Sequence, residues 1–195
     1  MKDLAAHSFP PLIGATAHTL ILGTMPGQAS LGAVQYYAHP RNALWPIMHA
    51  LISCNSPTLA THQTLSYDER CKLLTNAGYA LWDVLSSCER PGSLDSKIVR
   101  ASEIPNDIAS LVHKHPELSC IVCNGRTAET LFNRHIRNTL PEARLAAGQT
   151  DGERDEGLIK KNPSIRITSL PSTSPAMASL TLEQKYQRWA DGLLG

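Results

Sequence analysis

The sequence predicts an α/β fold: a three-layer α/β/α arrangement around a central, mainly parallel sheet of four strands. Short apolar runs of strand length alternate with amphipathic segments of helical length, and turn-forming residues follow the apolar runs. The length of 195 residues allows a sizeable buried core and suits one domain better than two. We therefore expect a single domain over residues 1–195.

Four segments of strand length predict the strands, at residues 19–23, 79–84, 120–123 and 165–170. In an open parallel sheet, ligands bind beyond the carboxyl ends of the strands. The loops that could carry a site are therefore those that start near Gly23, Trp82, Asn124 and Leu170.

Helical spacing and end signals predict five helices, at residues 43–53, 66–77, 105–115, 127–136 and 182–193. Ser66 and Glu69 form a capping box at the start of the second helix, and Gly78 can end it. Pro105 suits the first position of the third helix, with Ile104 counted on its buried face. The polar stretch 148–161 is expected to be a surface excursion.

Composition indicates an ordinary soluble protein, with 42% hydrophobic and 18% charged residues and no run as long as a membrane span. Residues 1–11 resemble neither a signal peptide nor a transit peptide. The cysteines are odd in number and scattered, which suits a reducing compartment; they are Cys54, Cys71, Cys88, Cys120 and Cys123. We expect a cytoplasmic, nucleoid-associated or nuclear location and no secretion.

The net charge of +1 provides no global field for nucleic acid, so DNA binding would need a local basic cluster. The candidates are Arg41, Arg126, Arg134, Arg137, Lys160 and Lys161. A solvated surface would explain most of these side chains equally well.

Two segments carry the chemistry. The first segment consists of Gly23-x-x-Pro26-Gly27 followed by Tyr37-Ala38-His39-Pro40-x-Asn42-x-x-Trp45. It resembles the first active-site motif of mismatch-specific uracil glycosylases and of hypoxanthine-DNA glycosylases, which both belong to the uracil-DNA glycosylase superfamily. The loop Leu170-Pro171-Ser172-Thr173-Ser174-Pro175-Ala176 resembles the second motif of that superfamily. The first motif is fairly specific, whereas the second is weak by itself.

The resemblance implies a uracil-DNA glycosylase-like fold and a monofunctional DNA repair glycosylase. Such an enzyme flips a deaminated base out of DNA and hydrolyses its N-glycosidic bond through an oxocarbenium-like state. Hypoxanthine is the first choice of base, and uracil opposite guanine is the second. Neither motif contains a lysine, so we expect an intact abasic site as product. We expect no metal or organic cofactor, damaged DNA as the partner, and a monomer.

By resemblance, Gly23, Met25 and Pro26 line the base pocket and Tyr37 stacks on the extruded base, a contact that contributes roughly 1–3 kcal/mol. Asp83 follows the second strand, where uracil glycosylases usually carry an asparagine that reads the base edge. It can accept from the N–H that hypoxanthine and uracil share, but a plain loop aspartate is an equal alternative.

The residues at the catalytic positions differ from those of the uracil glycosylases. Met25 occupies the position where these enzymes usually carry an Asp or Asn, and Leu170 occupies the position where they often carry a His or Asn. A thioether cannot orient water. Hypoxanthine-DNA glycosylases lack the same groups, and by resemblance Asn42 holds the attacking water instead. Asn42 could alternatively cap the helix that follows it.

The second motif is expected to contact DNA. Ser172 and Ser174 can bond phosphates, and Met177 can enter the gap left by the base. Arg41 is a further phosphate candidate. A plain turn and an exposed arginine are the alternatives.

Two other classes of protein compete with this interpretation. Zinc binding by His113, His115, Cys120 and Cys123 is disfavoured because cysteines at this spacing on a strand point to opposite faces, and the signatures of a zinc nucleobase deaminase are absent. A non-catalytic module that binds DNA or nucleotides is favoured by Met25 and Leu170.

Overall fold

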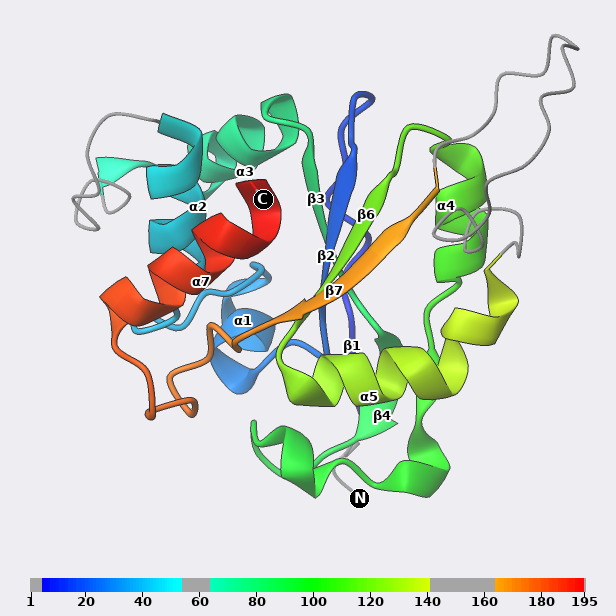
Figure 1. Ribbon diagram of the computed structural model, residues 1–195. Coiled ribbons are helices and arrows are strands. Elements are labelled where there is room, and N and C mark those ends of the chain that lie inside the picture. Colours follow the sequence, from blue (N-terminus) through cyan, green and yellow to red (C-terminus); the bar gives the residue numbers. More distant parts are fainter. Residues whose placement is uncertain (1–4, 54–63, 141–163, 195) are drawn as a thin grey trace, which may run out of the picture.

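The computed structural model describes residues 5–53, 64–140 and 164–194 (Figure 1). Its main sheet is wholly parallel, in the order β3-β2-β6-β7. The strands are β2 (Thr19–Gly23), β3 (Tyr79–Asp83), β6 (Cys120–Asn124) and β7 (Arg166–Leu170). Gly23 is paired with Asp83, and Asn124 with Leu170, so four sequence-distant residues meet at one edge.

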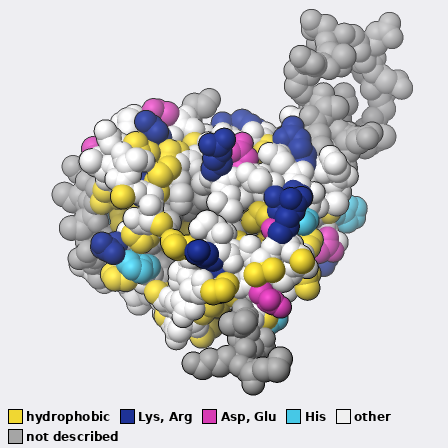
Figure 2. Space-filling model, turned by 90° about the horizontal axis from the view of Figure 1, so that it is seen from below, with side chains coloured by type: hydrophobic (Ala, Val, Ile, Leu, Met, Phe, Trp, Pro, Cys, Tyr) yellow, Lys and Arg dark blue, Asp and Glu magenta, His cyan; other side chains and the backbone are white. Residues whose placement is uncertain are grey.

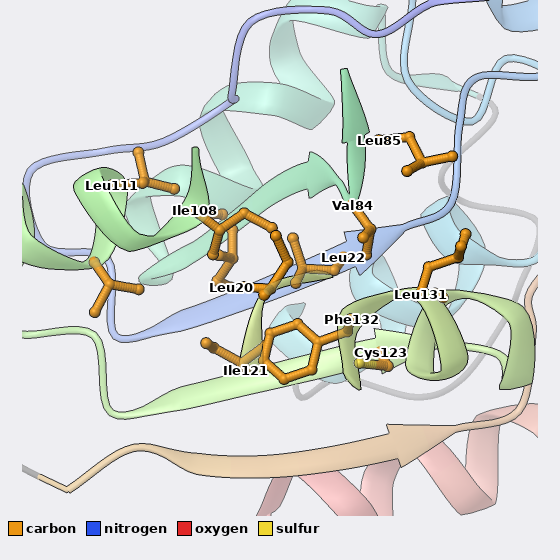
Figure 3. Close-up of a cluster of buried hydrophobic side chains, with 14 of the residues drawn as sticks. Leu20, Leu22, Val84, Leu85, Ile108, Leu111, Ile121, Cys123, Leu131 and Phe132 are labelled. Atoms are coloured by element: carbon orange, nitrogen blue, oxygen red, sulfur yellow. The ribbon is translucent and has the colours of Figure 1, made fainter. Parts of the chain in front are cut away.

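Helices cover both faces of this sheet (Figure 1). One face carries α2 (Leu44–Ser53), α3 (Tyr67–Asn76) and α7 (Leu182–Leu194), and the other carries α4 (Ile108–Lys114) and α5 (Arg126–His135). Side chains of β2 alternate between the two layers: Leu20 and Leu22 pack with Phe132 of α5 (Figure 3), whereas Ile21 packs with the α2 layer. The expected three-layer α/β/α fold is confirmed.

A second, antiparallel sheet was not expected from the sequence. It has the order β1-β4-β5 and consists of β1 (Ala5–His7), β4 (Leu85–Glu89) and β5 (Ile104–Pro105). The prediction that a helix starts at Pro105 was therefore wrong. Asp107 caps α4 instead, accepting from Ser110 N at 3.0 Å, and Ile104 is 56% exposed.

Short helices were also missed. They are α1 (Gln28–Ala33) and the 3-10 turns η2 (Asp95–Lys97), η3 (Arg100–Ser102) and η4 (Arg137–Thr139). The other helices lie close to their predicted ranges, with the Ser66–Glu69 capping box present and Gly78 at φ +82° after α3. The predicted excursion at 148–161, with Lys160 and Lys161, lies outside the described residues.

Cys120 packs in the cluster on the α2 side of the sheet and Cys123 in the cluster on the α5 side. The two thiols therefore face away from each other, as the strand geometry predicted. Within the described ranges, none of the helices has the length and apolar character needed to cross a bilayer.

Candidate active site

A cavity of about 450 Å³ opens at the carboxyl ends of the parallel strands, on the face shown in Figure 2. Nine of the ten predicted site residues line it: Gly23, Met25, Pro26, Tyr37, Asn42, Asp83, Ser172, Ser174 and Met177. The tenth, Arg41, lines a neighbouring groove together with Met177 and Lys185. The structure thus brings the predicted residues together, although their positions do not test their roles.

The floor of the cavity is built around Gly23. A Cβ at this position would collide with Oδ1 of Asp83 and would lie 3.0 Å from the Tyr37 hydroxyl. The other carboxylate oxygen, Oδ2 of Asp83, accepts from the Ser8 hydroxyl at 2.8 Å. Burial raises the pKa of Asp83 to about 7, with Ser8 and Arg90 opposing part of the shift. The floor of the cavity therefore carries a carboxyl group that changes between its neutral and ionised forms near neutral pH.

Tyr37 has an unusual backbone conformation, with φ at +54°. Hydrogen bonds of the two adjacent residues hold this conformation. Tyr36 O accepts from Trp45 Nε1 at 3.0 Å, and the Tyr36 hydroxyl donates to Phe9 O at 3.2 Å. On the other side, Ala38 N donates to Ser30 Oγ at 3.2 Å. Strained residues of this kind persist where surrounding contacts hold them, often at functional sites. Both tyrosines line the cavity, but Tyr36, only 5% exposed, also packs in the core.

The Tyr37 hydroxyl is buried and makes no hydrogen bond of standard geometry with the described residues, although the Asn124 side chain lies near enough to lower its pKa. Burial, together with the nearby Asp83 carboxylate, raises the pKa of Tyr37 well above its ordinary value, so the phenol stays neutral and able to donate.

Asn42 has the capping contact that was the alternative to a catalytic role. Its Oδ1 accepts from Leu44 N at 2.9 Å, at the start of α2. No partner of its Nδ2 is found in the described part of the chain, so this donor is free to act in the cavity. The cap and a role in the cavity are compatible, because the carboxamide oxygen has a second lone pair.

Sequence reasoning missed the joint that holds the second motif. Asn124 Nδ2 donates to Thr173 Oγ1 and Thr173 N donates to Asn124 Oδ1, both at 2.9 Å and both buried. Thr173 O in turn accepts from Ala43 N at 2.9 Å. The only signal in the sequence was the position of Asn124 at a strand end. This joint fixes the second motif beside Asn42.

The serines of the second motif shape their own loop. Ser172 Oγ accepts from Ser174 N, and Ser174 Oγ accepts from Ala176 N, each at 3.2 Å. Lys185 Nζ donates to Ser174 O at 3.1 Å. These are the turn contacts of the alternative interpretation, but both hydroxyl protons remain available as donors.

Arg90 and Asp95 were also missed. The side chain of Arg90 is 1% exposed; it donates to Met25 O at 3.4 Å and to Pro26 O, and lies 3.3 Å from Asp95 Oδ1. The Met25 side chain packs in the core cluster, and the polar contact of Met25 in this loop is made by its backbone carbonyl, which accepts from Arg90. Asp95 lines the same cavity as the second motif.

The parallel sheet and the cavity at its carboxyl edge, closed by the two motif loops, define a glycosylase-like α/β protein. The family model of the uracil DNA glycosylase superfamily matches residues 10–191. The chain belongs to this superfamily, and the resemblance inferred from the motifs is confirmed.

Individual relatives agree with this assignment. Two curated proteins named hypoxanthine DNA glycosylase are similar: that of Methanosarcina barkeri is 34% identical over 118 residues, covering 60% of this chain and 70% of the relative. That of Methanosarcina acetivorans is 35% identical over 120 residues, covering 62% and 71%. The solution NMR structure of a candidate uracil DNA glycosylase from M. acetivorans superposes with a TM-score of 0.68 at 25% identity, covering 95% of each chain.

Proposed function

We propose that this chain is a DNA repair glycosylase that flips hypoxanthine out of DNA and hydrolyses its N-glycosidic bond, leaving an abasic site. The observation that carries the proposal is the cavity floor, where Oδ1 of Asp83 and the Tyr37 hydroxyl both lie next to the position that a Cβ of Gly23 would take. The similarity to two proteins named hypoxanthine DNA glycosylase supports the same base.

The floor suits the edge of a deaminated base. Hypoxanthine presents an N–H next to a carbonyl, and an ionised Asp83 can accept from that N–H. Adenine has no proton on the equivalent nitrogen and would leave Oδ1 of the buried Asp83 carboxylate without a donor, which is costly. Uracil shares the favoured edge, but a cavity of about 450 Å³ has room for a two-ring base. These features rank hypoxanthine first and uracil second.

The remaining roles follow from the cavity lining. The Tyr37 ring supplies the stacking surface, and Asn42, held by Leu44 N, orients the attacking water. Ser172 and Ser174 donate to phosphates, Met177 enters the gap left by the base, and Arg41 in the neighbouring groove contacts the backbone.

The test is base release from duplexes that carry one deoxyinosine, one deoxyuridine or only normal bases, with alkali to cleave abasic sites. The native chain is expected to act on deoxyinosine, and Asn42→Ala to slow it by about tenfold or more, equivalent to about 1.4 kcal/mol of transition-state stabilisation. Asn133→Ala, an exposed change on α5, is the control and should keep the native rate.

If folded protein binds the deoxyinosine duplex tightly but releases no base, the proposed glycosylase activity is rejected. Such a result would favour the non-catalytic binding module instead, for which Met25 and the occupied Asn42 oxygen are the supporting observations.

A further inference from the structure

Hydrolysis of a glycosidic bond creates positive charge on the sugar and releases a proton from water. The amide of Asn42 can orient water but cannot take up that proton. Among the described residues that line the cavity, the imidazole and carboxylate side chains are those of His39, Asp83 and Asp95. The structure distinguishes between these three.

His39 is already committed, because its Nδ1 accepts from Arg41 N at 3.1 Å. In the neutral ring the proton is then on Nε2, which leaves a donor rather than an acceptor for the cavity. Asp83 lies at the floor, with Oδ2 bonded to Ser8 and Oδ1 against Gly23, where the base edge is read. Asp95 remains without a role in base recognition.

Contacts with neighbouring residues hold Asp95 at the edge of the first motif. Arg90 is buried against the carbonyls of Met25 and Pro26, and a buried cation needs a counter-charge. Asp95 is the acid with which Arg90 forms an ion pair in the described part of the chain. Ser93 Oγ accepts from Gln28 N at 2.9 Å and fastens this segment to the first motif. The Asp95 side chain is still 34% exposed, so it is open to the cavity.

We propose that Asp95 is a further catalytic residue, whose ionised carboxylate faces the sugar of the extruded nucleotide. This inference rests on the proposed glycosylase function. The bond between the sugar carbon and the base nitrogen breaks with its electron pair going to the base, and the water oxygen bonds to the sugar carbon. Asp95 stabilises the cationic sugar and takes the proton of the water, which then passes to the departing base through solvent.

The charge of Asp95 depends on the groups around it. Burial raises its pKa above the ordinary value, while the Thr24 hydroxyl and Arg90 oppose the shift. The other titratable groups whose charges interact with Asp95 are Asp83, Tyr37 and Cys88. Because the pKa of this acid is raised, the ionised form is lost as pH falls, and the rate of the chemical step should fall with it.

The experiment compares the native chain with Asp95→Asn, which keeps the shape and removes the charge. Single-turnover release of hypoxanthine should fall by about 100-fold or more, the usual scale for loss of one electrostatic contact to a transition state. Asp191→Asn, an exposed change on α7, is the matched control and should retain the native rate.

Binding of two abasic analogues gives a readout without turnover. One duplex carries a cationic pyrrolidine in place of the sugar, and the other carries a neutral tetrahydrofuran. The native chain should bind the pyrrolidine duplex at least about tenfold more tightly, and Asp95→Asn should lose this preference while still binding the neutral duplex.

A purely structural Asp95 would weaken binding of both analogues equally. Equal binding of both by the native chain, or hypoxanthine release by Asp95→Asn within about threefold of the native rate, would overturn the inference while leaving the proposed function intact. Failure of the native chain to release any base would reject the proposed function, and this inference with it.

Discussion

At the scale of single residues, Gly23 is a position where the addition of one methyl group should have a large effect on activity. Gly23→Ala places a methyl group against Asp83 Oδ1 and the Tyr37 hydroxyl. Overpacking of this kind costs about 1–3 kcal/mol, and displacement of Asp83 should lower hypoxanthine release about tenfold or more. Thermal unfolding and single-turnover rates measure the two effects.

The control is Gly32→Ala in α1, where an added Cβ meets nothing within 4 Å. This change should leave base release unaltered and stabilise the protein by up to about 1 kcal/mol, because glycine is unfavourable in helices. Equal activity of the two variants would contradict the described floor.

Asp83 predicts a pH dependence of base recognition. Its pKa is raised to about 7 by burial, so the ionised acceptor predominates above that value and is lost as pH falls through it. The affinity for a duplex with a non-cleavable deoxyinosine should therefore decrease between pH 8 and pH 6, by about tenfold at most per unit. Asp83→Asn, which accepts without titrating, should flatten the curve; an unchanged slope would show that another group controls binding.

At the scale of elements, the joint between β6 and the second motif should determine how well the loop is held. Thr173→Val keeps the shape of a fully buried side chain but removes the acceptor for Asn124 Nδ2. Leaving that amide unsatisfied should cost about 1–3 kcal/mol in the free energy of unfolding, measured by denaturant titration.

The matched control for the joint is Thr130→Val, an exposed change in α5 that removes a bond to Arg126 O. It should alter stability by no more than about 0.5 kcal/mol. Similar losses in both variants would mean that the joint adds little.

The elements also show how far sequence patterns extend. The strands β2, β3 and β6 were predicted because each is an apolar run with a turn-forming end, and β7 because Ile165 and Ile167 alternate with polar residues ahead of Leu170. β4 was missed because its apolar residues, Leu85 and Cys88, are three positions apart and do not alternate, and β5 because Pro105 suits a helix start as well as an edge strand. Whether a short segment pairs with a strand depends on its neighbours in space, which local patterns do not specify.

At the scale of the whole molecule, DNA binding should depend on few charges. Lys and Arg side chains are spread over the cavity face and do not form one patch (Figure 2), consistent with a net charge of +1. Arg126, which lines the cavity, is expected to contact phosphate. Arg126→Gln should reduce the salt dependence of binding by about 0.9 in log–log slope.

Arg134 of the same helix provides the comparison. It pairs with Glu103 at 2.7 Å, so Arg134→Gln should leave the salt slope unchanged. Anisotropy titrations of labelled duplex at several salt concentrations measure both slopes. A loss of slope in Arg134→Gln alone would place the DNA on a different surface.

The candidate site was predictable where residues share a motif or a strand end, as with Gly23, Tyr37, Asn42 and Asp83. Arg90 and Asp95 were missed because they approach the first motif through a loop that is distant in sequence, with Arg90 bonded to a carbonyl 65 positions away, and no local pattern indicates such an approach. Asn42 illustrates a further limit, since its residue type suits a helix cap as well as a cavity role, and the structure shows the cap contact directly.

The most direct test of the central claim is to identify the product released from a duplex with a single deoxyinosine. Mass spectrometry of the small-molecule fraction is run beside electrophoresis of the strands. The account predicts one free hypoxanthine for each strand that alkali later cleaves, and an intact strand before alkali. Strand cleavage without free hypoxanthine, or no release by folded protein, would contradict it.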